Sequence, residues 1–377
     1  MTKVLIVPDK FKSTLSSREV ADSLATGIRQ TCPRAELSSL VVSDGGEGFL
    51  EAVAQSEKME LHRVRLPGPG GRLHTGSVGV SPKSRSVYLE SCQATGFHLL
   101  DRKKRNPLKV SSEGLADLMQ AALVFRPRNL YIGLGSSATC DAGIPVAGRF
   151  GFEFRDAKKR KIAPKAENLG RIQTILAPDL KSIIPGRTRI FAVADVVNPP
   201  VGKKGGVKVY APQKGASPRE VTRLENGMQK LLRAMRKSGG KGLSSLPSGG
   251  AAGCLALGLH YFFGAKIIRG APFIFERLGL KKKIQASDIV ITGEGSFDEQ
   301  SFFGKITGNI IRTGRKHKKH IILVTGRTKV PGFLKKQVAA VFSVERLLDK
   351  EDRSGKKESR AALTEHGRRI GELISRK

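Results

Sequence analysis

The sequence predicts an α/β protein with two domains. Short apolar runs end repeatedly in Gly, Asp or Ser and then give way to helical periodicity, which is the pattern of a sheet whose functional loops follow its strands. The 377 residues exceed the length at which a single hydrophobic core stops growing, so two domains are expected. No internal repeat and no Pro/Gly-rich linker marks a sharp boundary between them.

The first half of the chain alternates expected strands and helices. Residues 3–7 are an apolar run of strand length, and Ser16 or Ser17 is placed to cap the helix that follows. Residues 40–42 form a strand edge, and the glycine-rich turn 44–48 follows it. In chain order, the expected elements are strand 3–7, helix 16–29, strand edge 40–42, strand 87–89, helix 112–125 and strand 130–134.

The second half continues the same alternation. Residues 190–194 form a strand that ends at Asp195, and residues 218–236 form an amphipathic helix with a basic polar side. The charge-rich segment 349–358 is expected to be a surface loop. In chain order, the expected elements are strand 190–194, helix 218–236, a helix from 250 to 263, strand 288–291, helix 300–315, strands 321–324 and 339–342, and helix 359–375.

The chain is strongly basic, with 67 Lys+Arg against 33 Asp+Glu and a net charge of +34. Such a charge points first to a polyanionic partner. The basic clusters at 102–105, 158–161, 281–283 and 315–320 are scattered, however, and aromatic residues are too sparse to interleave them as stacking platforms. A solvated basic surface that steers an anionic substrate inward is therefore favoured over nucleic-acid binding.

Cysteine usage and hydropathy predict a soluble, cytoplasmic protein. The four cysteines form no C-x-x-C pair, so neither a zinc site nor a disulfide framework is indicated. The apolar run at the N-terminus is too short for a signal peptide. Residues 251–265 are the longest apolar stretch, which is shorter than the ~20 residues of a membrane helix and contains His260.

One glycine-rich turn follows a clear strand. Residues 133–139 could cradle phosphate through bare backbone N–H groups and the hydroxyls of Ser136, Ser137 and Thr139. A tight strand-to-helix turn with no ligand explains this loop equally well. Neither a G-x-x-x-x-G-K-[ST] loop nor a protein-kinase catalytic loop occurs, which excludes the common phosphoryl-transfer folds.

Carboxylates are scarce in this chain but concentrate in the loops at strand ends. This placement favours Mg²⁺ coordination and a base for a substrate hydroxyl, while each acidic residue alone is more often a helix cap or an Asx turn. Lys12, Lys214 and Lys305 stand beside the same loops and could stabilise a transferring phosphate. The histidines show no metal spacing, and Cys140 is better explained as a small buried residue than as a nucleophile. The acidic residues concerned are Asp9, Asp44, Glu47, Asp141, Asp195, Glu294 and Asp298.

Seven segments, in the same order along the chain, resemble the motifs of type 1 glycerate kinases. The P-D-K-F-K run at 8–12 resembles the family's P-D-S-F-K. The D-G-G-E-G run at 44–48 is identical to the family's D-G-G-E-G. The full set comprises residues 8–12, 44–48, 135–141, 194–199, 211–216, 249–253 and 292–301, with Gly304 and Lys305 where the family has G-K. Seven colinear motifs are far more specific than one glycine loop.

The resemblance implies a flavodoxin-like parallel-sheet domain built from both chain ends and a second α/β domain inserted between them. The expected boundaries are residues 1–105 and 285–377 for the first domain and 106–284 for the second, with the active site in the cleft between them. The implied reaction is ATP-dependent phosphorylation of D-glycerate with Mg²⁺, 2-phosphoglycerate being favoured over 3-phosphoglycerate.

The resemblance also assigns roles to individual residues. Asp195 would activate the substrate hydroxyl, with Lys12 and Asp44 as further catalytic residues. Glu294 and Asp298 would contact the metal. The residues expected to bind substrate or phosphate are Asp9, Glu47, Gly135, Ser136, Ser137, Thr139, Asn198, Gln213, Lys214 and Lys305.

Several positions depart from the family pattern. Ser136 replaces a glycine and adds a Cβ where the backbone would approach phosphate, and Ser296 replaces an arginine that could clamp a carboxylate or phosphate. Two other readings therefore stay open, namely a kinase of another small hydroxy acid and a weakened kinase scaffold whose basic surface binds polyanions. The sequence leaves the oligomeric state and the product's regiochemistry undetermined.

Overall fold

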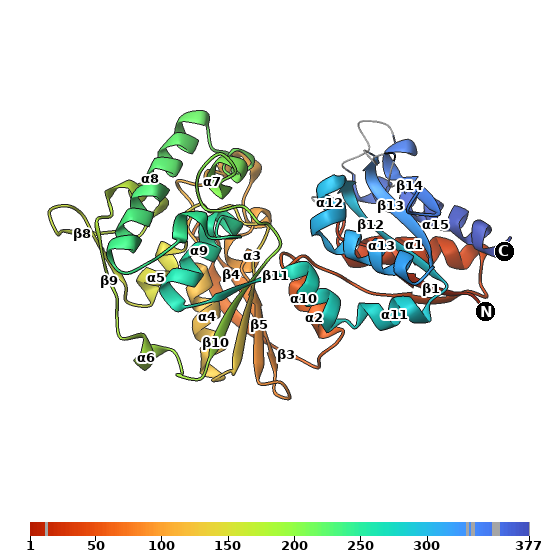
Figure 1. Cartoon of the computed structure of the whole chain (residues 1–377), viewed down its shortest axis with the longest axis horizontal. Coiled ribbons are helices and arrows are strands. Elements are labelled where there is room, and N and C mark those ends of the chain that lie inside the picture. Colours follow the sequence, from red (N-terminus) through yellow and green to blue (C-terminus); the bar gives the residue numbers. More distant parts are fainter. Residues whose placement is uncertain (12–13, 329–331, 333–335, 349–354, 377) are drawn as a thin grey trace. The chain divides into compact units, whose positions relative to one another are not determined.

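The computed structural model describes residues 1–11, 14–328, 332, 336–348 and 355–376. Their contacts divide the chain into two compact units. Unit 1 comprises Met1–Asp44, Glu51–Ser56 and Ala271–Lys377, and unit 2 comprises Gly45–Leu50 and Glu57–Gly270. Figure 1 shows that unit 1 combines the two ends of the chain, coloured red and blue.

Unit 1 is built on a parallel sheet that is five-stranded in the described part of the chain, with strand order β14-β13-β12-β1-β2. Numbered within the unit, this order is 2-1-3-4-5, which is that of flavodoxin-like folds. The strands are β1 (Lys3–Ile6), β2 (Glu36–Ser39), β12 (Ile289–Phe297), β13 (His320–Thr328) and β14 (Ala340–Ser343).

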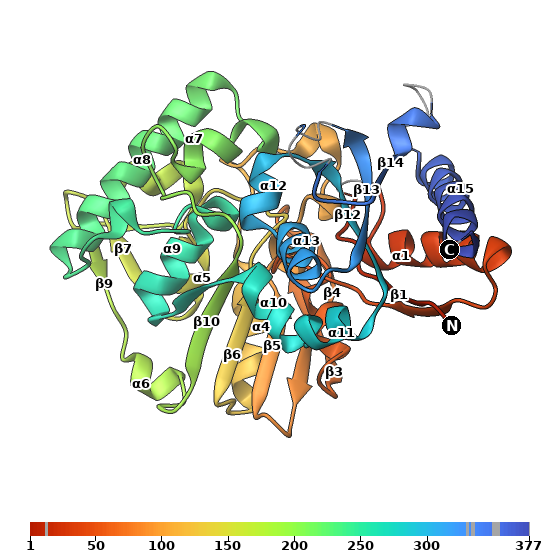
Figure 2. The ribbon, with the colours of Figure 1, turned by 45° about the vertical axis from the view of Figure 1, so that its right-hand side comes forward.

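Helices cover both faces of this sheet. One core joins β1 and β12 to α1 and α15, and a smaller cluster joins Phe297 and Leu323 to Ile311 of α13. Figure 2 shows α1 with α15 on one side of the strands and α13 on the other. The helices of this part of the chain are α1 (Ser17–Thr31), α2 (Phe49–Ala54), α10 (Gly270–Arg277), α11 (Leu280–Ala286), α12 (Glu299–Gly304), α13 (Ile306–Lys316) and α15 (Lys356–Ser375).

Unit 2 is built on a mixed sheet with strand order β11-β10-β6-β5-β4-β3, in which the first four strands run parallel. The strands are β3 (Glu60–Pro67), β4 (Leu73–Ser81), β5 (Ser86–Glu90), β6 (Asn129–Gly133), β10 (Arg189–Ala194) and β11 (Lys266–Arg269). A small antiparallel sheet adds β7 (Glu153–Arg155), β8 (Lys161–Ile162) and β9 (Thr174–Leu176). The helices are α3 (Cys92–Thr95), α4 (Gly114–Val124), α5 (Ile144–Arg149), α6 (Leu180–Ile183), α7 (Gly206–Tyr210), α8 (Pro218–Lys237) and α9 (Ala251–Phe263).

The division into units differs from the boundaries expected at 105 and 284. Residues 57–105 group with the middle of the chain because β3 and β4 pair as an antiparallel hairpin, β4 pairs with β5, and β5 pairs with β6. The backbone hydrogen bonds between these strands therefore all lie within unit 2. The sequence pattern did not predict this hairpin.

Most expected elements are confirmed to within a few residues, and two are wrong. Residues 300–315 are not one helix, because Lys305 is extended (φ −99°, ψ 171°) and separates α12 from α13. Residues 40–42 are not a strand, since β2 ends at Ser39. Of the expected loop 349–358, residues 349–354 lie outside the described residues and 356–358 belong to α15.

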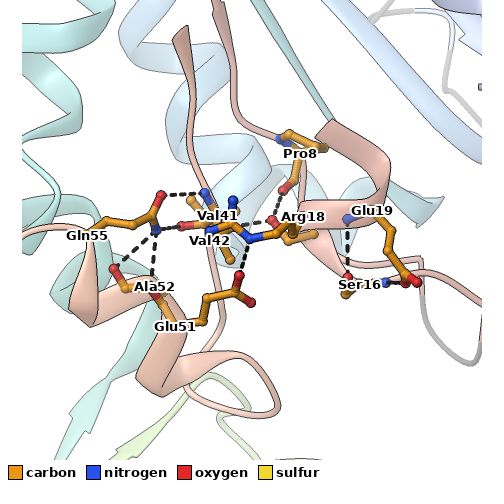
Figure 3. A network of polar contacts seen from close by, with 10 residues as sticks. Pro8, Ser16, Arg18, Glu19, Val41, Val42, Glu51, Ala52 and Gln55 are labelled. Carbon is orange, nitrogen blue, oxygen red and sulfur yellow. Dashed lines mark hydrogen bonds and ion pairs between the residues drawn. The ribbon is translucent and has the colours of Figure 1, made fainter. Parts of the chain in front are cut away.

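Side chains replace a strand partner at residues 41–42, after Leu40, whose N–H still donates to the Ile6 carbonyl of β1 at 2.9 Å. Gln55 accepts from the Val41 N–H at 2.9 Å and donates to the Val41 carbonyl at 2.7 Å, and the Ser17 hydroxyl accepts from Val42 at 3.0 Å (Figure 3). Ser17 in turn donates to the carbonyl of Pro8 at 2.7 Å, and Arg18 pairs with Glu51. The network therefore fixes the chain just before Asp44 without a ladder. No helix in the described part of the chain is long and apolar enough to cross a membrane.

Candidate active site

Three carboxylates of unit 1, those of Asp9, Asp44 and Glu294, influence one another electrostatically. Asp9 follows β1 and donates its N–H to the Gly293 carbonyl at 2.8 Å, while Glu294 lies in β12; each is 4% exposed. Burial, followed by the negative charge of Asp44, raises the pKa of Asp9 to about 7, although Lys10 opposes the shift. Asp9 can therefore gain or lose a proton near neutral pH.

Two lysines neutralise this carboxylate set. The Lys10 ammonium lies 3.4 Å from the Asp44 carboxylate. Lys305 pairs with Glu294 and donates to the Ser301 hydroxyl at 3.3 Å. Burial alone would lower the pKa of Lys305, but the Glu294 charge outweighs it and the pKa is raised. Lys12, expected here from the sequence, lies outside the described residues, whereas Lys10, which was not among the expected site residues, contacts Asp44.

The two residues expected to contact a metal have protein partners. Asp298 caps α12 by accepting from the N–H and hydroxyl of Ser301 at 2.8 and 3.1 Å, and Glu294 pairs with Lys305. Glu47 is exposed. Among the described residues, no group of three or more His, Cys, Asp or Glu side chains is arranged to hold a metal ion.

In unit 2, the loop after β6 turns its carbonyl groups into the protein. The Gly133 carbonyl accepts from Ser91 at 2.9 Å, the Ser136 carbonyl accepts from Phe97 at 3.1 Å, and the Thr139 carbonyl accepts from the Lys214 ammonium at 2.7 Å.

Unlike these carbonyls, three backbone N–H groups of the same loop are not hydrogen-bonded to any described residue. Within the described chain, those of Gly135, Ser136 and Ser137 have no hydrogen-bond acceptor. Ser136 has a left-handed backbone (φ 52°), so the Cβ that distinguishes it from the family's glycine is held in a strained conformation. Successive unpaired N–H groups in such a turn make an anion-binding concavity.

Glycines let this loop lie directly on residues 45–46. A Cβ at Gly133 would fall 2.4 Å from the Gly45 carbonyl oxygen, and one at Gly135 would fall 2.7 Å from the Gly46 Cα. Gly45 itself has φ +97°, and a Cβ there would fall 2.8 Å from the Val193 carbonyl oxygen. These positions exclude side chains because two backbones touch there. Gly45 and Gly46 are thus packed against the ends of β6 and β10.

Asp195 follows β10 at the same edge of the sheet as the β6 loop, because β6 and β10 are parallel neighbours. Its side chain is 7% exposed and lies 3.8 Å from the Arg269 guanidinium. Asn198 fixes the following loop, accepting from the Tyr210 hydroxyl at 2.7 Å and donating to the Lys204 carbonyl at 2.8 Å. Gln213 is exposed.

Asp141 and Cys140 belong to the interior of unit 2. The Asp141 carboxylate accepts from the N–H and hydroxyl of Ser112 at 2.8 and 2.9 Å and from the N–H of Gly143 at 3.0 Å. Burial raises the pKa of the Cys140 thiol to about 11, so it is not a thiolate at neutral pH. Both residues serve the packing of the loop.

Two cavities, of about 650 and 400 Å³, border α8. Arg233, Arg236 and Lys241 line the first, and Arg219, Arg223 and Lys230 line the second. Neither contains a residue that the sequence predicted for the site.

Comparison with known proteins identifies the class. A model of the glycerate kinase family matches residues 4–375. Glycerate 2-kinase from Escherichia coli (strain K12) is 33% identical over 349 residues, covering 91% of this chain and 90% of that protein. Glycerate kinase from Halalkalibacterium halodurans is 30% identical, covering 86% of each chain.

A solved structure agrees with these sequence matches. A crystal structure from Salmonella typhimurium LT2, assigned as glycerate kinase 2, aligns with a TM-score of 0.78 and 30% identity, covering 100% of this chain and 98% of that one. The protein is thus an α/β phosphotransferase. It belongs to the glycerate kinase family, which confirms the resemblance and the fold class expected from the sequence.

Proposed function

We propose that this protein transfers the γ-phosphoryl group of ATP to D-glycerate and that 2-phosphoglycerate is its main product. The observation that carries phosphoryl transfer is the loop after β6, where three successive N–H groups lack an acceptor in the described chain while the neighbouring carbonyls point inward. Phosphate oxygens are acceptors that such N–H groups bind well. The preference for the 2-position is supported by the similarity to the E. coli Glycerate 2-kinase.

The proposal assigns Asp195 to the substrate hydroxyl. This assignment is supported by the place of Asp195 directly after β10, at the sheet edge where the β6 loop also lies, and by the Arg269 guanidinium 3.8 Å from its carboxylate. Lys12 and Asp44 are proposed as the other catalytic residues. The proposed substrate and phosphate contacts are Asp9, Glu47, Gly135, Ser136, Ser137, Thr139, Asn198, Gln213 and Lys305.

The contacts favour some of these assignments more than others. The Asn198 amide is bonded to Lys204 and Tyr210, so its support for the substrate would come through the shape of the 198–210 loop. Gln213 and Glu47 are exposed, so a ligand in solution can reach their side chains, which change rotamer readily at a surface.

Mg²⁺ enters the proposal as a partner of the nucleotide phosphates. Mg²⁺ retains several waters and needs only one or two protein carboxylates when phosphates supply the remaining ligands. Glu294 fits this requirement if the Lys305 ammonium moves away from its carboxylate. The Asp298 carboxylate already accepts hydrogen bonds as the cap of α12. When bound, the ion would neutralise charge that develops on the transferring phosphoryl group.

The test is a coupled ATP-turnover assay on D-glycerate with Mg²⁺, in which ³¹P NMR reads the position of the product phosphate. We expect turnover and a 2-phosphoglycerate signal. A panel of other small hydroxy acids serves as the comparison, because Ser296 replaces an arginine of the family pattern. Faster turnover of another acid would replace the substrate assignment, and ATP binding without any turnover would contradict kinase activity.

A further inference from the structure

Lys214 is almost completely buried, which is costly for an ammonium group. It is 3% exposed and ends the short 3₁₀ turn Pro212–Lys214. The next residue, Gly215, has φ +93°, and a Cβ there would fall 2.2 Å from the Arg105 carbonyl oxygen. The turn that carries Lys214 is therefore tightly fixed, and the buried charge requires a partner.

The partner is a backbone carbonyl of the phosphate-binding loop proposed above. The Lys214 ammonium donates to the Thr139 oxygen at 2.7 Å. Gly253, with φ +71°, closes the other side, since a Cβ there would fall 1.9 Å from the same oxygen. The Thr139 carbonyl thus lies between an ammonium and a backbone, and it would be left unsatisfied without the lysine.

The chain that closes over this carbonyl is held in an unfavourable conformation. Ala252, Gly253 and Cys254 are successive residues with left-handed φ of 51°, 71° and 65° at the start of α9. Ala142, which donates its N–H to the Gly253 carbonyl at 3.2 Å, also has a positive φ of 53°. Strain of this kind persists only where surrounding contacts impose it.

We propose that Lys214 is a positioning residue, which holds the Thr139 carbonyl inward and so keeps the N–H groups of Gly135, Ser136 and Ser137 available to phosphate. It acts through the loop and does not touch the phosphate. This inference rests on the proposed function, because it takes the loop to be the phosphate site. Burial lowers the pKa of Lys214, and its amine N–H can donate to the carbonyl whether or not the group is charged.

The variant Lys214→Met tests the proposal, since methionine retains the apolar stem and removes the donor. We expect the KM for ATP to rise at least about tenfold, with a smaller fall in kcat and an almost unchanged KM for glycerate. A fall in kcat of about 1,000-fold with an unchanged KM for ATP would instead indicate direct contact with the transferring phosphoryl group. Wild-type kinetics would show that the residue is only structural.

The matched control is Glu225→Gln on α8. Glu225 is also a buried charge (3% exposed), and it accepts from the Gly202 N–H at 2.8 Å in the loop after β10. This substitution removes a buried charge and leaves the Thr139 carbonyl untouched. The KM for ATP should therefore stay within about threefold of wild type; an increase as large as that of Lys214→Met would overturn the assignment to Lys214.

A second measurement uses the wild-type protein and does not depend on a stable variant. Amine acetylation followed by mass spectrometry should leave Lys214 unmodified with and without ATP, while the exposed Lys241 is modified in both states. Modification of Lys214 in the free protein and protection by ATP would show that it contacts the nucleotide. This readout needs no turnover, so failure of the glycerate assignment would leave it interpretable.

Discussion

At the scale of single residues, burial decides which charged groups can carry chemistry. Asp195 and Asp9 are both acidic residues that follow a parallel strand, yet their surroundings differ. Asp195 has a guanidinium 3.8 Å away, whereas Asp9 is buried near other carboxylates and has a raised pKa of about 7. The raised pKa of Asp9 lets its carboxyl exchange a proton near neutral pH.

Replacing Asp195 with asparagine should remove most turnover and leave the fold intact. General-base catalysis typically contributes about 10²–10⁴-fold, so we expect kcat to fall by roughly that factor. The substitution retains size and polarity, so the thermal midpoint should stay within about 3 °C. The measurements are steady-state kinetics and a thermal scan. Wild-type turnover would remove Asp195 from the mechanism.

Replacing Asp9 with asparagine should stabilise the protein increasingly as pH rises. Folded Asp9, with its pKa of about 7, keeps a proton that the unfolded chain releases near pH 3.8, so its contribution to stability falls as pH rises between these values. The asparagine side chain would not titrate, and its oxygen could still accept from the N–H of Lys10. We expect the gain over wild type to reach on the order of 2 kcal/mol at pH 8.

Urea unfolding at about pH 5, 6.5 and 8 measures this gain. The exposed Asp101 supplies the control, because Asp101→Asn should show no growth of the difference with pH. A gain for Asp9→Asn that is equal at all three pH values would contradict the raised pKa.

At the scale of elements, the packing of α1 on α15 depends on glycines. A Cβ at Gly27 would fall 2.0 Å from the Thr364 carbonyl oxygen, and one at Gly367 would fall 2.4 Å from the Leu24 carbonyl oxygen. Thr31 donates from its hydroxyl to the Arg368 carbonyl at 2.8 Å. The first and last helices of the described chain therefore meet backbone to backbone.

Gly27→Ala should destabilise unit 1 despite the better helix propensity of alanine. The propensity gain is about 1 kcal/mol, but the clash with backbone forces the helices apart, and overpacking usually costs about 1–3 kcal/mol or more. We expect a lower urea midpoint by circular dichroism. Gly186→Ala, where the added methyl meets no atom within 4 Å, should change stability by less than about 0.5 kcal/mol. Equal effects at both positions would contradict the close crossing.

At the scale of the whole molecule, the net charge of +34 works against compactness. Like charges repel in the folded state more than in the expanded chain, and salt screens this repulsion. The described ion pairs that salt would also weaken are mostly exposed, for example Arg369–Glu365 and Lys104–Asp101, and exposed pairs contribute little.

Raising NaCl from about 20 to 200 mM should therefore raise the thermal midpoint by about 2–5 °C. Chloride is preferred to sulfate, which strengthens apolar burial by exclusion from the surface. A variant with Lys281, Lys282 and Lys283 changed to glutamine has three fewer positive charges and should show a smaller rise. An unchanged or falling midpoint in wild type would show that repulsion is not a significant term.

The sequence by itself determined the α/β class, the parallel strands and the family. Apolar runs of strand length, helix caps such as Ser16 and colinear glycine motifs are local features, so they can be recognised before the chain folds. The motifs also pointed to Asp9, Asp44, Asp195 and Glu294; Asp9 and Asp195 do follow strands, whereas Glu294 lies within β12, which extends to Phe297.

Only the tertiary structure decided which partners these residues have. Lys214, expected from the sequence beside a phosphate, donates to the Thr139 carbonyl, and residues 41–42, expected at a strand edge, are bonded by the side chains of Gln55 and Ser17. Asp298 likewise proved to be a helix cap, and the hairpin β3–β4 joined 57–105 to unit 2. These outcomes depend on partners distant in sequence, because burial and hydrogen bonding are set by what the fold brings near and not by the residue's own neighbours.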